Sequence, residues 1–306
     1  MSLPGGAELA RRLADESSFP SRDKRDRSDL IKVASFYQWA GDRDRLLHQL
    51  HEVFVQEPPW GKIHDFLAAF PQDLFIVTTN YDDLVERAFQ AHQKPFHLVV
   101  HCTEPSHRNS VQWWEPHAEQ PRYCTPSELP LRPGKDGTII YKMHGTVSRV
   151  RPEFDSFVIT EDDYIDFLAR MIAGSGVPAR FGVHFRHARF LYLGYGLADW
   201  NLRVMIRNLK PEARAALAAR VSRGHAADGM HALREVGIGP DADAAAELSD
   251  ESPHKSWAIQ SRPSELESSL WEARHVKIFP MTVNEFVDGL TRELAEQAKK
   301  NRGPER

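Results

Sequence analysis

Polar or glycine-containing clusters follow three apolar runs of this sequence, and the clusters carry side chains that are suited to catalysis. The runs and their clusters are residues 74–79 before Asn80-Tyr81-Asp82, residues 138–143 before His144-Gly145, and residues 189–193 before Gly194-Tyr195-Gly196. In an open, mostly parallel sheet, the carboxyl ends of the strands line up at one edge, and ligands bind there. The sequence therefore predicts that an amide, a carboxylate, an imidazole and a glycine-containing loop converge on one site. Such a layout is typical of an enzyme.

The elements that would position these clusters alternate between apolar strands and amphipathic helices. This alternation predicts an α/β fold with a Rossmann-like, mostly parallel sheet and helices on both faces. We expect one domain over residues 1–306, with a sheet core in residues 62–100, 136–150, 186–210 and 253–300 and a smaller helical lobe in residues 7–60 and 150–185. Further helices are expected at residues 200–209 and 211–221. The proline-rich residues 103–137 are expected to form a long loop with room for one short hairpin, with Trp113-Trp114 as a packing anchor.

The composition limits the classes of protein to which the chain can belong. Its 306 residues include 39 basic and 43 acidic ones, and the net charge of −4 gives no overall positive field for nucleic acid. No apolar run approaches the roughly 20 residues that span a bilayer, and no signal-peptide pattern opens the sequence. Cys102 and Cys124 suit free thiols in a reducing compartment better than a disulfide framework. We therefore expect a cytoplasmic enzyme or binding module, with no membrane and no direct nucleic-acid partner.

Three motifs, in order along the chain, carry a resemblance to a known family. They are Thr78-Thr79-Asn80-Tyr81-Asp82, Lys142-Met143-His144-Gly145-Thr146 and Gly194-Tyr195-Gly196-Leu197-Ala198-Asp199. Sirtuins carry Thr-Gln-Asn-Ile-Asp, His-Gly and Gly-Thr-Ser-Leu at the same points of a Rossmann-type sheet. The chain resembles the bacterial sirtuin-like family over most of its length. That resemblance implies chemistry on NAD, at the bond between nicotinamide and ribose.

The resemblance also implies roles for individual residues. Asn80 is expected to position the ribose hydroxyls or the attacking water. His144 is expected to act as the general base, which suits an imidazole that titrates near neutral pH. Asp82 resembles the residue that reads the nicotinamide carboxamide. The remaining contacts to the cofactor are expected from Thr79, Gly194, Tyr195 and Gly196.

Each of these residues also has a purely structural interpretation. Asn80 can be a turn residue in a left-handed conformation, and His144 can be a histidine packed in the core. Asp82 can cap the helix that follows it, a role that is compatible with ligand binding. Gly194 and Gly196 can be plain turn glycines. The sequence alone leaves both interpretations open.

Two departures from the sirtuin pattern bear on the function. Protein-deacylating sirtuins have a four-cysteine zinc module between the His-Gly strand and the glycine loop, whereas residues 146–189 contain no cysteine. Because a four-thiolate zinc site needs four cysteines, the resemblance favours the zinc-free branch, whose members hydrolyse NAD. The family also begins with a strand and a Gly-Ala-Gly loop that cradles the pyrophosphate. No such segment precedes the first helix here, so we expect that the chain has been shortened or its start misplaced, or else that this version binds NAD poorly.

Two hypotheses of different classes follow from the sequence. The first is an NAD+ glycohydrolase that releases nicotinamide and ADP-ribose and acts in bacterial antiphage defence by depleting NAD+. The family implies that such an enzyme is controlled by homo-oligomerisation or by a partner such as a HerA-type ATPase or a short Argonaute. The second is a regulatory subunit that binds NAD or ADP-ribose without cleaving it. A protein deacylase or an ADP-ribosyltransferase is a third interpretation, and the missing zinc cysteines disfavour the deacylase.

Overall fold

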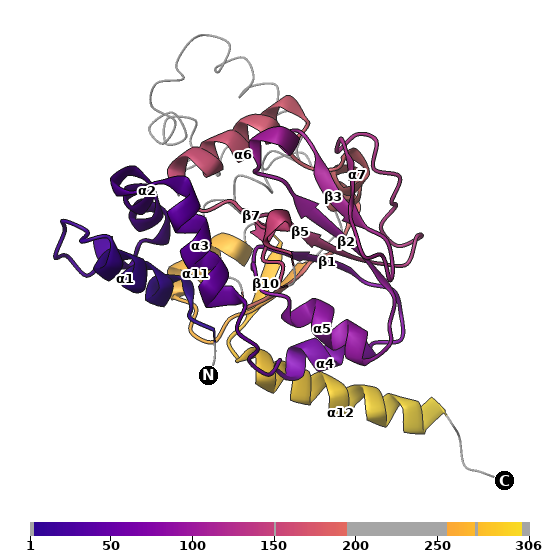
Figure 1. Cartoon of the computed structure of the whole chain (residues 1–306). Helices are drawn as coiled ribbons and strands as arrows, with labels where there is room; N and C mark the ends of the chain where they lie inside the picture. The colour runs from indigo at the N-terminus through magenta and orange to yellow at the C-terminus, as the bar shows by residue number, and fades with distance from the viewer. Residues whose placement is uncertain (1–2, 150, 195–255, 273–274, 302–306) are drawn as a thin grey trace. The chain divides into compact units, whose positions relative to one another are not determined.

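A computed structural model of the chain describes residues 3–149, 151–194, 256–272 and 275–301 (Figure 1). The chain divides into two compact units, residues 1–182 and residues 183–306. Each unit contains a hydrogen-bonded sheet of its own. The organisation as a single domain stays a prediction. The predicted helices at residues 200–209 and 211–221 lie outside the described residues.

The first unit is built on a mixed five-stranded sheet with the strand order β1-β5-β2-β3-β4. Its strands are β1 (Phe75–Thr78), β2 (Phe96–His101), β3 (Val111–Trp114), β4 (Arg122–Cys124) and β5 (Thr138–Lys142). β1, β5 and β2 run parallel, whereas β3 and β4 extend the sheet in antiparallel pairs. Every residue of β5 is buried, as expected of a central parallel strand in a sheet that has helices on both faces. A short antiparallel pair follows it, formed by β6 (Gly145–Thr146) and β7 (Ser156–Phe157).

Helices cover both faces of this sheet. The helices of the first unit are α1 (Gly6–Glu16), α2 (Leu30–Ala40), α3 (Arg43–Phe54), α4 (Lys62–Ala69), α5 (Leu84–Ala91) and α6 (Glu161–Ala173), and α7 (Ala179–His187) crosses into the second unit. Ala88 and Phe89 of α5 are fully buried and pack with Ile76 of β1. α4 and α5 lie on one side of the sheet and α6 on the other (Figure 1). The predicted fold class, a Rossmann-like α/β fold with a mostly parallel sheet, is therefore confirmed.

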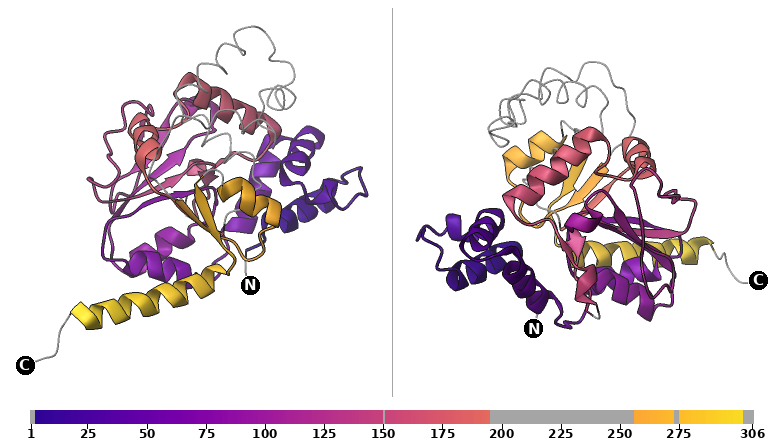
Figure 2. Two further views of the ribbon diagram at one scale, coloured as in Figure 1. Left: turned by 180° about the vertical axis from the view of Figure 1, so that it is seen from behind. Right: turned by 45° about the horizontal axis from the view of Figure 1, so that its top comes forward.

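α1, α2 and α3 form the helices that were predicted within residues 7–60, and they pack together as a helical lobe (Figure 2). The core of this lobe contains Leu9, Leu13, Val33, Leu46 and Leu50, each of which is at most 2% exposed. Tyr81 and Val147 belong to the same apolar cluster, although both come from segments that follow strands of the sheet. The helical lobe therefore packs directly against the segments that carry the predicted site.

The second unit has a three-stranded parallel sheet with the order β10-β9-β8. Its elements are β8 (Leu191–Leu193), β9 (Ser256–Ile259), α11 (Glu265–Glu272), β10 (Val276–Phe279) and α12 (Val283–Asn301). Trp271 of α11 is 2% exposed, and Ala258 and Ile259 of β9 are each 1% exposed, so these side chains are buried in the core of this small unit. Within the described ranges, no helix is both long enough and apolar enough to cross a membrane.

The region between α5 and β5 differs from the sequence prediction. The prediction has no strand at β2, and it treats residues 103–137 as a loop with at most one hairpin. β2 pairs with β3 and extends the main sheet, and β3 with β4 forms the one short hairpin that the prediction allowed within residues 103–137. The Trp113 indole donates a hydrogen bond to His97 Nδ1 (3.2 Å) and lies under the Arg122 guanidinium, as expected of a packing anchor.

Candidate active site

The strand register places the Asn80 and His144 segments side by side. Thr78 of β1 pairs with Lys142 of β5, so Asn80 and His144 each lie two residues beyond a paired position on neighbouring parallel strands. The pairing continues past the strand ends, because the Met143 N–H donates to the Thr78 carbonyl (3.0 Å). The predicted convergence of these two segments at one edge of the sheet is therefore present in the backbone.

The turn after β1 is fixed by local hydrogen bonds. The Asn80 N–H donates to Thr78 Oγ1 (3.1 Å), and the side chain of Asn80 is exposed. Asn80 does not have a positive φ, so the interpretation as a left-handed turn residue is wrong. Asp82 Oδ1 accepts a hydrogen bond from the Leu84 N–H at the start of α5 (3.2 Å), whereas the N-cap position of this helix is Asp83, whose side chain makes no capping hydrogen bond. Thr79, between Thr78 and Asn80, is half-buried.

His144 is buried in an aromatic environment. It is 5% exposed, and its ring makes edge-to-face contacts with Tyr164 and Phe167 of α6, at centroid distances of 5.3 and 5.7 Å. Burial lowers the pKa of His144 to about 4, because the apolar surroundings disfavour the charged imidazolium. The ring is therefore neutral at pH 7, which is the form that accepts a proton. The same packing would suit a core histidine, so burial alone does not separate the two interpretations.

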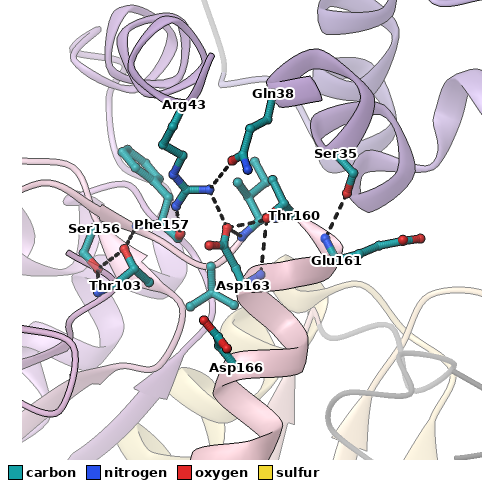
Figure 3. Close-up of polar contacts among 12 residues, drawn as sticks. Ser35, Gln38, Arg43, Thr103, Ser156, Phe157, Thr160, Glu161, Asp163 and Asp166 are labelled. Carbon is teal, nitrogen blue, oxygen red and sulfur yellow. Dashed lines mark hydrogen bonds and ion pairs between the residues drawn. The ribbon is translucent and has the colours of Figure 1, made fainter. Parts of the chain in front are cut away.

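The start of α6 is anchored so that its aromatic residues stay against His144. Thr160 and Asp163 form a capping box, in which each side chain accepts from the backbone N–H of the other. Arg43 of the helical lobe donates to Asp163 Oδ2 (2.7 Å) and to the Phe157 carbonyl (2.9 Å). Figure 3 shows these contacts converging at the amino end of α6. The helical lobe and β7 thereby fix the helix that covers His144.

A second buried imidazole lies near the first and was not predicted. His101, at the end of β2, is 1% exposed and packs edge-to-face on Phe167 (4.9 Å between centroids), the ring that also contacts His144. Burial lowers the pKa of His101 well below its ordinary value, and the positive charge of Arg170 and the neighbouring His144 act in the same direction. The sequence signal for His101 was its place at the end of an apolar run that was not recognised as a strand.

A buried ion pair lies under the Asn80–Asp82 turn, and the sequence prediction gave it no role. Lys142, the last residue of β5, is fully buried, and its ammonium lies 2.8 Å from Oε1 of Glu86 on α5. The ammonium also donates to the carbonyls of Tyr81 and Asp82. The sequence signal for this ion pair is the lysine inside an apolar run, because a buried ammonium requires partners. Glu86 also lines a cavity of about 320 Å³, and none of the predicted site residues is among the described residues around that cavity.

The glycine cluster belongs to the second unit. Gly194 directly follows β8 with a φ of +63°, a conformation that favours glycine. It lines a cavity of about 270 Å³ at the carboxyl ends of β8, β9 and β10, together with Gln260, Ser261, Thr282 and others. Tyr195 and Gly196 lie outside the described residues. Gly194 is therefore placed at a cavity of the kind that parallel sheets offer to ligands.

The described side chains show no metal centre. Among them, no group of three or more histidine, cysteine or acidic residues could hold a metal ion. Cys102 and Cys124 are free thiols, and burial raises the pKa of both. The absence of zinc from this protein stays a prediction.

All three motifs fall within one family match. Residues 74–236, more than half of the chain, match the SIR2-like domain. The chain belongs to the SIR2-like domain family. One curated relative, NAD(+) hydrolase ThsA of Bacillus cereus (strain MSX-D12), is 22% identical over 191 residues, which cover 60% of this chain and 32% of that protein. The match thus spans about a third of the relative's length. The resemblance to sirtuin-like proteins is confirmed.

The buried histidine of this SIR2-like chain should make its stability depend on pH. Between the ordinary pKa of 6.5 and the folded value of about 4, the unfolded chain binds more protons at His144 than the folded chain. Stability must therefore fall as the pH falls through this window. His144 alone should contribute a loss of about 2 kcal/mol between pH 8 and pH 5. Urea denaturation at both pH values measures the loss, and His144→Phe should lose less. An equal pH dependence in the two proteins would contradict the prediction.

Proposed function

We propose that this chain is an NAD+ glycohydrolase, which cleaves NAD+ to nicotinamide and ADP-ribose. The observation that carries the proposal is the register of β1 and β5, which puts the Asn80 and His144 segments next to each other in the SIR2-like region. The printed name of the relative ThsA, an NAD(+) hydrolase, supports the same reaction. The site residues proposed for catalysis are Asn80 and His144.

The chemistry of the reaction fits the character of these residues. Nicotinamide leaves as a neutral ring, so the site needs a positioned acceptor more than a strong acid. The neutral imidazole of His144 is able to take a proton from a water molecule or a ribose hydroxyl. The exposed amide of Asn80 is free to orient one of these groups. Asp82 and Thr79, from the same turn, are proposed to contact the nicotinamide half of the substrate.

The cavity beside Gly194, within the second unit, is proposed to bind a part of NAD+. Its volume of about 270 Å³ is below the roughly 300–1,000 Å³ that is usual for a whole ligand, so it suits only a portion of the dinucleotide. The φ of +63° at Gly194 lets the backbone bend tightly at the rim of the cavity. Gly194, Tyr195 and Gly196 are accordingly proposed as binding residues, without a catalytic role.

Release of nicotinamide from NAD+ tests the proposed reaction. The purified protein, with and without assembly partners, should release nicotinamide, and Asn80→Ala and His144→Ala should each lower kcat by roughly 100-fold or more. His92→Ala is the matched control, because His92 is an exposed histidine that follows α5. Full activity in both site variants would contradict the assignment of Asn80 and His144.

A second candidate function is a regulatory subunit that binds NAD or ADP-ribose without cleaving it. The observation that favours it is the burial of His144, because an imidazole with a pKa of about 4 is a weak base. Calorimetry separates the two functions. Heat of NAD binding without any nicotinamide release, with all partners present, would support the regulatory subunit.

The biological role is proposed from the same family. We expect the enzyme to act in the bacterial cytoplasm as an effector of antiphage defence, which stops growth by depleting NAD+. Control by homo-oligomerisation, by a HerA-type ATPase or by a short Argonaute is part of this proposal. Measurement of cellular NAD+ after phage infection tests it: the level should fall in cells with the wild-type chain and should stay constant in cells with Asn80→Ala.

A further inference from the structure

Lys142 has all of its hydrogen-bonding capacity satisfied in the interior of the first unit. An ammonium group has three N–H donors. The three acceptors around Lys142 are Glu86 Oε1 at 2.8 Å, the Tyr81 carbonyl at 3.2 Å and the Asp82 carbonyl. The side chain of Lys142 is fully buried, and that of Glu86 is 8% exposed. Such an arrangement is specific, because a buried ammonium is unfavourable unless every donor has a partner.

Two of the three acceptors belong to the turn that carries the proposed site residues. The carbonyls of Tyr81 and Asp82 lie directly after Asn80 in the chain. Lys142 itself lies two residues before His144 on the neighbouring strand. A single side chain therefore connects the turn with Asn80 and Asp82 to the strand that leads to His144. Glu86, in the first turn of α5, is the third acceptor of the ammonium.

We propose that Lys142 and Glu86 are a positioning pair, which fixes the turn at residues 80–82 relative to His144. The expected effect of the pair on turnover rests on the proposed function. The anchoring of the turn by the pair does not depend on that function. The pair touches none of the reacting groups. Its role would be to keep the Asn80 amide and the Asp82 carboxylate in one arrangement, because small displacements of such groups lower the rate strongly.

Stability alone does not require this ion pair. Two buried charges can often be replaced together by apolar side chains of similar size without loss of stability, whereas removal of one partner is strongly destabilising. Apolar side chains, however, cannot donate hydrogen bonds to the carbonyls of Tyr81 and Asp82. Replacement of both charges therefore separates a positioning role from a purely structural one.

The test uses the double variant Lys142→Met/Glu86→Leu in the full chain. We expect it to unfold at nearly the same urea concentration as the wild type. Amide hydrogen exchange in residues 79–83 should become roughly tenfold faster or more, because the turn has lost its anchor. The kcat for NAD+ should fall by roughly 10- to 100-fold, with a smaller change in KM. The control is Arg132→Gln/Asp136→Asn, which removes an ion pair that precedes the first residue of β5. This control should change neither the amide exchange in the turn nor kcat.

Each outcome decides a different point. Unchanged exchange in residues 79–83 would overturn the anchoring, and faster exchange with an unchanged kcat would overturn the positioning role. If the double variant is itself strongly destabilised, exchange in residues 79–83 is compared with exchange in β2 of the same variant. A larger increase in the turn than in β2 would support the anchoring, and an equal increase in both would overturn it. If the wild-type chain releases no nicotinamide, the proposed glycohydrolase fails, and the exchange comparison still decides whether Lys142 anchors the turn.

Discussion

Gly145→Ala is expected to destabilise the protein severely. A Cβ at this position would lie 1.9 Å from the Ser156 carbonyl oxygen and 2.4 Å from its carbon, and both are backbone atoms that cannot move independently. Gly145 also has a φ of +95°, which is unfavourable for any side chain. We expect the free energy of unfolding, measured with urea, to fall by roughly 3–5 kcal/mol.

Gly137→Ala provides the matched control. Gly137 precedes β5 with a φ of +84°, and a Cβ there would meet nothing within 4 Å. This variant isolates the backbone strain from the steric overlap and should lose about 1 kcal/mol. If Gly145→Ala were as mild as Gly137→Ala, β6 and β7 would have to be able to separate without a large loss of stability.

The steric overlap explains why the residue after His144 in the His-Gly motif is a glycine. Gly145 pairs with Phe157 across β6 and β7, and the close approach of the two chains leaves no room for a side chain. The same pairing continues one residue past the two strands, because the His144 carbonyl accepts a hydrogen bond from the Val158 N–H (2.8 Å). The glycine thus sets the path of the chain immediately after His144. A substitution there should affect turnover through the position of His144.

The parts of the fold that the sequence predicted are those with a strong local pattern. β1 and β5 are unbroken apolar runs that end in polar clusters, and α6 begins with a capping box that is visible in the sequence. β2 was missed because His97 and His101 interrupt its apolar residues. The hairpin of β3 and β4 was expected within residues 103–137, but its pairing with β2 was not, because that pairing joins separate segments and has no local pattern in the sequence.

Some residues of the candidate site could be proposed from the sequence, and others could not. Motif residues such as Asn80 and His144 could be assigned from their order along the chain. The pair of Lys142 with Glu86 joins residues 56 positions apart, and a contact at that separation has no local signature. The sequence left open whether His144 is buried, because its burial depends on α6, which follows in the chain. Contacts between side chains far apart in the chain are therefore harder to predict than the motif residues themselves.

Arg149→Met is expected to loosen the junction between the helical lobe and the sheet. Arg149 makes a bidentate ion pair with Asp83 at the start of α5 (2.5 and 2.8 Å), and it donates to the carbonyls of Val55 and Gln56 after α3 (2.9 and 2.6 Å). The side chains of Arg149 and Asp83 are only 14% and 19% exposed, so water cannot fully replace these bonds. We expect the free energy of unfolding in urea to fall by about 3 kcal/mol.

Two further variants test whether the planar geometry of the Arg149 guanidinium or its charge is responsible for the stability of this junction. Arg149→Lys keeps the charge but cannot reproduce the planar fork, so it should lose about half as much stability as Arg149→Met. Arg132→Met removes another bidentate arginine–aspartate pair, in which Arg132 is 57% exposed, and should cost less than about 1 kcal/mol. Equal losses for Arg149→Met and Arg132→Met would show that burial adds nothing at this junction. A loss confined to Arg149 would instead identify it as the residue that ties the end of α3 to the start of α5, next to the turn that carries Asn80.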